Sequence, residues 1–233
     1  MGIDLAEAEQ TLQEYRCFRE LFSRRLQPGA RPIHSEDDAI VSPVDGCITT
    51  LGTVEQGRLI QAKGISYSLA DLLENGELAQ KFEGGTFITL YLRPKDYHRI
   101  HCPFNGKVLA TQPIGGALFP VKPYVVRNLR GLMTRNERLL ILLETKLGHV
   151  AMVCVAAAGV GTITKLFGRT GNGDQSSSLE FELKKGDEVA AFNMGSTVIL
   201  FFEPGKVIFE PLDIGQEVRM GQILARSVAH AQA

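Results

Sequence analysis

Short runs of β-branched and aliphatic residues, separated by glycine, fill most of the chain from Val41 onward. Such runs are typical of β-strands with tight turns between them. Only one further short helix is predicted, near Ser68 to Leu73, so the expected fold is α+β and mainly β. The predicted strands are Gly46–Leu51, Thr86–Leu92, Lys107–Thr111, Leu139–Glu144, His149–Ala156, Gly161–Leu166, Ser196–Phe202 and Lys206–Phe209.

The N-terminal segment has a different, helical pattern. Apolar residues recur at intervals of three and four from Leu5 to Leu26, and Pro28 and Gly29 follow. This predicts one amphipathic helix within an N-terminal unit of residues 1–30, followed by a domain of residues 31–233. The helix either packs on its own domain or lies on a membrane or partner protein, since four arginines crowd its C-terminal half.

Charge and composition exclude several classes of function. The chain has 25 Lys and Arg against 26 Asp and Glu, which argues against a general nucleic-acid binder. The longest apolar run, Val150 to Val160, is too short to span a bilayer and is typical of a buried strand. The four cysteines form no Cys-x-x-Cys pair, so we expect a reducing compartment and no disulfide framework.

One pattern occurs twice, sixty residues apart. Pro43–Gly46 and Pro103–Gly106 both have the sequence Pro-x-Asx-Gly. In each case the second residue after the glycine is aliphatic. They are either two similar tight turns or the sign of a pseudo-repeated β-barrel or sandwich in which the turns meet.

Near the C-terminus, residues Lys184 to Val207 alternate glycine turns and strands in the layout of a biotinyl or lipoyl hammerhead. The hairpin tip carries Gly195-Ser196 instead of a modifiable lysine, which disfavours a swinging-arm carrier. A strained Gly-Ser bond also permits attack of the serine hydroxyl on the glycine carbonyl, given a base and oxyanion donors. Taken alone, however, Gly-Ser in a turn is usually only a turn.

A second motif places Asp96, His98 and His101 within six residues, directly after a predicted strand. A zinc site is disfavoured because Pro94 and Pro103 flank the segment and no third cluster of ligands appears. The histidines are therefore either hydrogen-bonded structural residues or acid–base groups for proton transfer.

Together these motifs resemble the phosphatidylserine decarboxylase family, the pyruvoyl-dependent type of bacteria and mitochondria. The resemblance runs from about Tyr15 to Gly221. Met194-Gly195-Ser196-Thr197 is similar to the family's Gly-Ser-Thr processing motif, with methionine where leucine is more common. The segments that carry the rest of the resemblance are Asp96–Pro103, Pro43–Gly46, Gln61–Leu69, Gly116–Val121 and Arg135–Leu139.

The resemblance implies a proenzyme that cuts itself between Gly195 and Ser196. Asp45, His101 and Ser196 would form the relay for the cut, in which His101 takes the serine proton and Asp45 orients its ring. The products would be a β chain of residues 1–195 and an α chain of residues 196–233. Residue 196 would become a covalent pyruvoyl group, the cofactor that forms a Schiff base with phosphatidylserine and allows release of CO2.

The resemblance also implies further site residues. His98 is expected to act as the general acid, with Asp96 as its neighbour or as an auxiliary base in processing. Which histidine serves which step stays open at this point. Lys63, Arg93 and Arg99 could bind the lipid phosphate, and the apolar segment Leu118 to Val126 either touches lipid or belongs to the core or a dimer interface.

The expected partners are membrane phosphatidylserine, the two chains of the same proenzyme and a second copy in a homodimer, with no metal and no nucleic acid. The expected location is the cytoplasmic face of the cell membrane, as a peripheral enzyme. Family members usually carry a longer apolar N-terminal region that engages the membrane, whereas this sequence begins at or just before the predicted amphipathic helix. The alternatives are a pyruvoyl decarboxylase of a small amino acid and a non-catalytic carrier-like β module.

Overall fold

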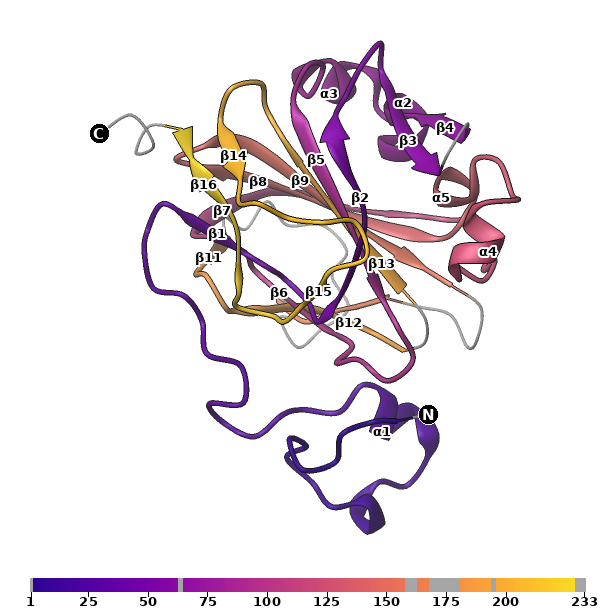
Figure 1. The fold of residues 1–233 in the computed structure, drawn as a ribbon, viewed down its shortest axis with the longest axis vertical. Coiled ribbons are helices and arrows are strands. Elements are labelled where there is room, and N and C mark those ends of the chain that lie inside the picture. Colours follow the sequence, from indigo (N-terminus) through magenta and orange to yellow (C-terminus); the bar gives the residue numbers. More distant parts are fainter. Residues whose placement is uncertain (1, 63–64, 158–162, 168–180, 194–195, 229–233) are drawn as a thin grey trace.

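The computed structural model describes residues 2–62, 65–157, 163–167, 181–193 and 196–228. It is mainly β, as predicted, and its largest sheet has eight antiparallel strands (Figure 1). Their spatial order is β11 (Phe181–Leu183), β7 (Gly106–Ile114), β8 (Arg138–Thr145), β9 (Gly148–Ala156), β13 (Ser196–Phe202), β5 (Thr86–Leu92), β2 (Gly46–Thr53) and β15 (Glu217–Val218).

Three smaller sheets and several short helices complete the body. One sheet joins β1 (Ala39–Val41), β16 (Ile223–Ser227) and β14 (Val207–Phe209). A second joins β10 (Ile163–Lys165), β12 (Glu188–Phe192) and β6 (Arg99–His101), and a hairpin joins β3 (Arg58–Ala62) and β4 (Ile65–Ser68). The helices of the body are α2 (Leu69–Leu73), α3 (Gly76–Lys81), α4 (Pro123–Val126) and α5 (Leu132–Arg135).

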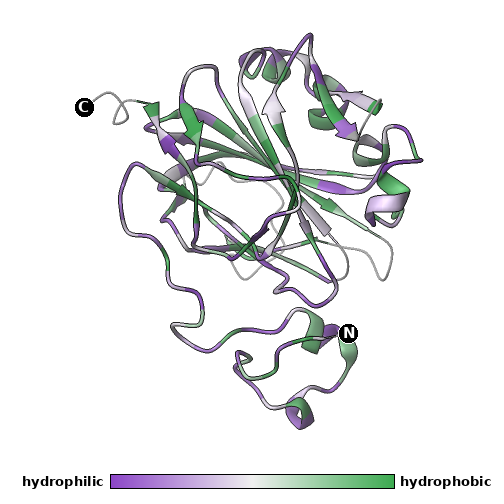
Figure 2. Ribbon diagram, in the orientation of Figure 1, coloured by the Kyte–Doolittle hydropathy of each residue, from purple (hydrophilic) through white to green (hydrophobic). Residues whose placement is uncertain are grey.

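Strand β13 lies at the centre of the large sheet and is buried along its whole length. Val198, Leu200 and Phe202 belong to one apolar core, whereas Ile199 and Phe201 belong to another. The first core is shared with the two three-stranded sheets, and the second with α2, α3, α5 and the β3–β4 hairpin. Figure 2 shows hydrophobic positions, in green, along many strands of the body. The large sheet is thus the middle layer of three.

All eight predicted strands are confirmed in the part of the chain that the structure describes, with ends that differ by a few residues. The predicted short helix is also confirmed as α2, which Ser68 caps by accepting a hydrogen bond from the Asp71 amide at 3.2 Å. Helix α3 begins in the same way at Asn75 and was not predicted. The predicted loop at Gly168–Ser178 lies outside the described residues.

The predicted amphipathic helix over Leu5–Leu26 is wrong. The segment contains a 3-10 turn, η1 (Leu12–Glu14), and one short helix, α1 (Phe18–Phe22). The chain doubles back across these two elements, so that Ala8, before the turn, pairs with Leu26, after the helix. A continuous helix would be about 33 Å long, and it could not fold back to bury Phe22 against the body as the structure does. Residues 2–31 form a small N-terminal lobe below β6 and β12 (Figure 1).

The two Pro-x-Asx-Gly turns lie side by side. The amide of Val41 donates to the Pro103 carbonyl at 3.0 Å, and the amide of His101 donates to the Pro43 carbonyl at 2.9 Å. The turns therefore meet in space, which is one part of the second interpretation. The described sheets are open, however, and the relation to a pseudo-repeated barrel or a hammerhead stays a prediction.

Candidate active site

Ser196 is the first residue of β13 and is fully buried. It pairs with Leu92 on β5 and with Ala156 on β9. Its hydroxyl has no hydrogen-bond partner in the described structure. An unpartnered buried hydroxyl costs about 1–3 kcal/mol and calls for a functional explanation. Gly195, the other half of the predicted cleavage site, lies outside the described residues.

The histidine motif is connected to the strand beside this serine, and it pairs with the strand that leads into the serine. Strand β5 ends at Leu92, the residue paired with Ser196. The chain then turns and returns as β6, which pairs with β12, and the Phe192 amide donates to the His98 carbonyl at 2.9 Å. Phe192 precedes Ser196 by only four residues. The topology thus joins the motif to the strand beside Ser196 and places its His98 end against the strand that leads into the serine.

The ring of His98 is completely buried and has one free nitrogen. Its Nδ1 lies 2.8 Å from the carbonyl oxygen of Asp96, which can only accept, so Nδ1 carries the proton. Nε2 therefore has a lone pair, and no partner is found for it among the described residues. Burial lowers the pKa of His98 to about 3, although the bond to Asp96 opposes this shift. In this structure His98 is a neutral imidazole.

Both ring nitrogens of His101 are occupied. Nδ1 donates to the carbonyl of Gly186 at 2.7 Å, which leaves the lone pair on Nε2. The Tyr97 hydroxyl lies 2.9 Å from Nε2 and donates to it. Burial lowers the pKa of His101, again against the effect of its backbone bond. His101 is thus the same tautomer as His98, but its basic nitrogen has a partner.

Asp45 binds Arg31 and not His101 in the described structure. The Arg31 Nε lies 2.8 Å from Oδ1 and its Nη2 lies 2.5 Å from Oδ2, while the Met220 amide donates to Oδ1 at 2.9 Å. A charged bidentate donor binds a carboxylate more strongly than a neutral imidazole does. The predicted orienting contact from Asp45 to the His101 ring is therefore absent here. The negative charge of Asp45 nevertheless opposes the lowering of both histidine pKa values.

The Asp96 carboxylate faces Arg93, and only its backbone carbonyl reaches His98. Its Oδ2 accepts from the Arg93 amide at 2.8 Å and from Nε at 2.9 Å. Arg93 also binds Glu217. The side-chain hydrogen bonds to Glu217 and to Asp96 raise the pKa of Arg93, so its guanidinium stays charged and paired with these carboxylates. Arg93 is accordingly engaged by carboxylates and not presented to a ligand.

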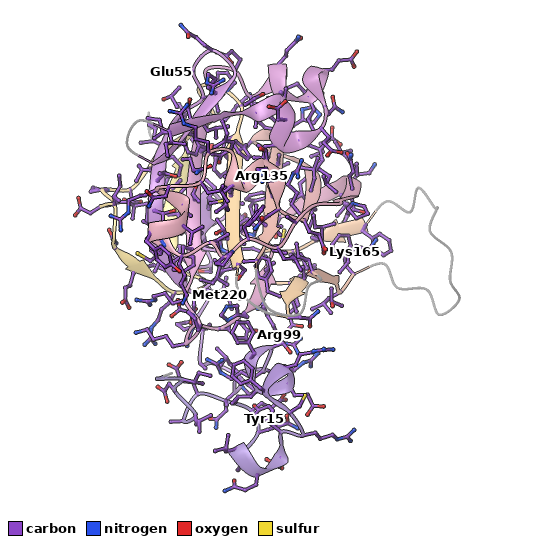
Figure 3. All side chains as sticks on the ribbon, turned by 90° about the vertical axis from the view of Figure 1, so that its right-hand side faces the viewer. Tyr15, Glu55, Arg99, Arg135, Lys165 and Met220 are labelled. Carbon is purple, nitrogen blue, oxygen red and sulfur yellow. The ribbon has the colours of Figure 1, made fainter. Side chains whose placement is uncertain are left out.

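Arg99, the second predicted phosphate contact, is also engaged. It binds Glu188 at 3.0 Å and donates to the carbonyl of Ser23 at 3.0 Å. Figure 3 shows it at the junction between the sheets and the N-terminal lobe, which carries Tyr15. Arg99 therefore holds the lobe in place. Lys63, the third predicted contact, lies outside the described residues.

An apolar pocket of about 430 Å³ lies on the other side of the large sheet, beside Thr197. Tyr91 and Thr197 of the large sheet line it, together with Val126 and Arg127 at the end of α4. Because side chains alternate along a strand, Ser196 and Thr197 point to opposite faces. The pocket consequently reaches the residue next to Ser196 without containing the serine hydroxyl.

Sequence reasoning missed several residues that shape the site. Phe22 packs on the His98 ring with centroids 3.8 Å apart, and Arg31 binds Asp45. Neither belongs to a motif, and the helical pattern of the N-terminal segment concealed their role. Tyr97 lies inside the histidine motif, between Asp96 and His98, and that position was the one available sign.

Two other kinds of site are not found within the described ranges. No group of three or more His, Cys, Asp or Glu side chains is arranged to hold a metal ion. No described helix has the length and apolar character needed to cross a membrane.

Comparison with known proteins shows that the chain is an enzyme of the carboxy-lyase class, a decarboxylase. A family model described as phosphatidylserine decarboxylase matches residues 18–226, and the chain belongs to this family.

Three curated relatives carry the name phosphatidylserine decarboxylase proenzyme. The protein from Anaeromyxobacter sp. (strain K) is 47% identical over 96% of this chain and 82% of its own length. The Acinetobacter baylyi protein is 42% identical over 97% of this chain and 81% of its own length. The Acidovorax ebreus protein is 41% identical over 96% and 82%, respectively.

Proposed function

We propose that this chain is a phosphatidylserine decarboxylase that makes its own pyruvoyl cofactor from Ser196. The observation that carries the proposal is the buried, unpartnered hydroxyl of Ser196 at the start of the central strand, beside the histidine motif. The word proenzyme in the names of the relatives supports processing of the chain. A residue that is consumed to form the cofactor has no need of a permanent hydrogen-bond partner.

In the proposed cut, the Ser196 oxygen attacks the Gly195 carbonyl carbon, and the peptide bond becomes an ester as the serine nitrogen takes up a proton. Removal of the Ser196 α-proton then eliminates the Gly195 carboxylate and leaves a dehydroalanine. Addition of water and loss of ammonia convert this residue into the pyruvoyl group. Atoms and charges balance without an oxidant or a metal.

His101 is the proposed base for the serine proton, and its Nε2 lone pair is the group that accepts it. The Tyr97 hydroxyl occupies this lone pair in the uncut chain, so it must turn away before the transfer. Asp45 stabilises the protonated ring through its charge, since it opposes the lowering of the His101 pKa without touching the ring. Arg31 keeps Asp45 in place meanwhile.

The proposed products are chains of residues 1–195 and 196–233. Strand β13 would start the second chain, and its partners β5 and β9 belong to the first. Ladders on both sides of a fully buried strand would hold the two chains together after the cut.

A pyruvoyl group supplies a ketone that condenses with the substrate amine and takes up the electron pair as CO2 leaves. His98 is the proposed general acid that returns a proton to the α-carbon. In the uncut chain it is neutral, because burial lowers its pKa. The carboxylate of a bound substrate would raise that pKa and allow protonation, since nearby negative charge favours the imidazolium.

The apolar pocket beside Thr197 supports a lipid substrate over a small soluble amino acid. We propose that the enzyme acts as a peripheral protein at the cytoplasmic face of the membrane. The homodimer expected from the family resemblance stays a prediction.

Intact-mass measurement of the purified protein tests the proposal. It should show a fragment that ends at Gly195 and a blocked fragment of 38 residues, 233 minus 195. Ser196→Ala should stay one chain, whereas Thr197→Ala keeps the attacking hydroxyl and should still be cut. A wild-type protein that decarboxylates phosphatidylserine as a single uncut chain would refute the pyruvoyl mechanism.

A further inference from the structure

Arg127 is the single charged side chain in the lining of the apolar pocket within the described residues. It follows α4 directly and is exposed. The rest of the lining is mainly aliphatic, aromatic or hydroxyl-bearing, with Gln61 as the one amide side chain. A lone cation in an apolar pocket matches a ligand with one anionic group and a large apolar part.

The Arg127 guanidinium has no ion pair or side-chain hydrogen bond in the described structure. Arg93 and Arg99, by contrast, each bind a carboxylate of the protein. Arginine is well suited to phosphate, because its planar donors can bind two oxygens at once. Of these three arginines, only Arg127 is available for an external anion.

A buried amide fixes the segment that carries Arg127. The Gln61 side chain donates to the carbonyls of Val126 and Leu129, both at 2.7 Å, and accepts from the Leu132 amide at 3.1 Å. Gln61 is only 5% exposed. Its three bonds tie the backbone on both sides of Arg127 to the β3–β4 hairpin, so the arginine is held at the pocket and not on a loose loop.

Large apolar side chains are exposed around the same pocket. Ile60 and Ile214 line it, yet they are 61% and 68% exposed. Tyr124, in α4, is 60% exposed. Two such side chains in the lining of one pocket, with a third on the helix that borders it, are unusual on a water-facing surface and fit contact with acyl chains.

We propose that Arg127 binds the phosphodiester of the phospholipid substrate, while the acyl chains run out past Ile60 and Ile214. This inference rests on the proposed function and names the headgroup contact of the same site. Thr197 lines the pocket and is the residue whose nitrogen would carry the pyruvoyl group. The reacting residue is thus one strand position, about 3.3 Å, away from the pocket.

The test compares Arg127→Gln with Arg130→Gln. Arg130 is an exposed arginine three positions along the same segment, and it does not line the described pocket. The substrate is dihexanoyl phosphatidylserine in its monomeric range, so that vesicle binding does not enter. Arg127→Gln should raise KM about ten-fold, as expected for loss of one charge-assisted hydrogen bond, with kcat within about two-fold. Arg130→Gln should leave KM unchanged, and Arg127→Lys should recover part of the loss.

A second readout needs no cofactor and separates phosphate from carboxylate. Dihexanoyl phosphatidylethanolamine keeps the phosphodiester and both acyl chains but lacks the carboxyl group. Calorimetry should show it binding to the uncut Ser196→Ala chain, with about ten-fold weaker affinity when Arg127→Gln is added. A contact to the substrate carboxylate would leave this affinity unchanged.

Three results would overturn the inference. They are unchanged phosphatidylethanolamine affinity in Arg127→Gln, equal losses in the Arg127 and Arg130 variants, and no binding of the lipid to the uncut chain. Failure of the proposed function is recognised separately, since a wild-type chain would then neither cut itself nor release CO2. The binding measurement on the uncut chain still decides the role of Arg127 in that event.

Discussion

The guanidinium of Arg31 binds both oxygens of the Asp45 carboxylate, and the two side chains are only 6% and 10% exposed. The same Nη2 also binds Glu7 at 2.7 Å. One arginine of the N-terminal lobe thus balances two carboxylates, which raises its own pKa although burial opposes this. The lobe is therefore part of the electrostatics of the candidate site.

Arg31→Gln should destabilise the fold strongly. In the uncut Ser196→Ala background we expect the free energy of unfolding to fall by about 3 kcal/mol, because an unpaired buried carboxylate remains. Arg219→Gln is the control, since Arg219 binds the other oxygen of Glu7 but is 69% exposed. It should cost less than about 1 kcal/mol. Urea denaturation measures the free energy of unfolding of both variants. Equal losses of stability would show that burial does not strengthen the Arg31–Asp45 pair.

The strands could be predicted because their residues specify them locally. Thr86–Leu92 and Ser196–Phe202 are rich in β-branched, aromatic and leucine residues, and both strands have the predicted ends. The order in which the strands pair could not be predicted, since it depends on contacts between distant segments. The meeting of the turns at Pro43 and Pro103 was visible only as a repeated pattern.

The N-terminal lobe shows why part of the site escaped prediction. Its apolar spacing fits a helix, but Phe22 and Arg24 gain more by packing on the histidine motif than a long exposed helix would provide. The periodicity of a sequence reports local structure and contains no information on contacts between distant segments. The serine and the two histidines were found because they lie in compact motifs, whereas Arg31 lies in none.

The two histidines should separate in their effects. His101→Ala should stay uncut, because the proposed base for the Ser196 proton is lost. His98→Ala should cut itself but fail to decarboxylate, with turnover reduced about 100-fold or more, as is typical for loss of a general acid. Mass spectrometry and a CO2 assay measure the two steps. His149→Ala is the control, because His149 binds Glu203 in another part of the sheet.

The opposite outcome would reassign the roles. His98 has the free Nε2 in the uncut chain, and its backbone lies against Phe192, four residues before Ser196. An uncut His98→Ala chain together with a cut His101→Ala chain would make His98 the processing base.

Tyr97→Phe tests whether the hydroxyl on His101 restrains the cut. Tyr97 is buried, and the change removes one oxygen while keeping the ring that packs beside His101. Because Nε2 is then free, self-cleavage should be at least as fast as in the wild type. A time course of freshly translated protein, followed by mass, measures the rate. Slower cleavage would mean that the Tyr97 hydroxyl itself takes part in the proton relay.

Burial of His98 should make the uncut chain less stable in acid. Its pKa is lowered to about 3 in the folded chain, whereas an exposed imidazole has a pKa near 6.5. Between these values the unfolded chain binds a proton that the folded chain does not, so the free energy of unfolding falls as the pH falls below 6.5. One such group gives a slope of at most about 1.4 kcal/mol per pH unit.

The pH effect can be assigned to His98 by comparing Ser196→Ala with Ser196→Ala/His98→Gln in urea at pH 7.5 and pH 5. The double variant should lose less stability on acidification, because glutamine binds no proton. Some pH dependence should remain, since burial also lowers the pKa of His101. In the parent chain the His98 ring signals should not titrate in NMR spectra between pH 8 and pH 4.5. A titration midpoint near 6.5 would show that His98 is open to water. It would refute the proposal that His98 is protonated only when a charged substrate is bound.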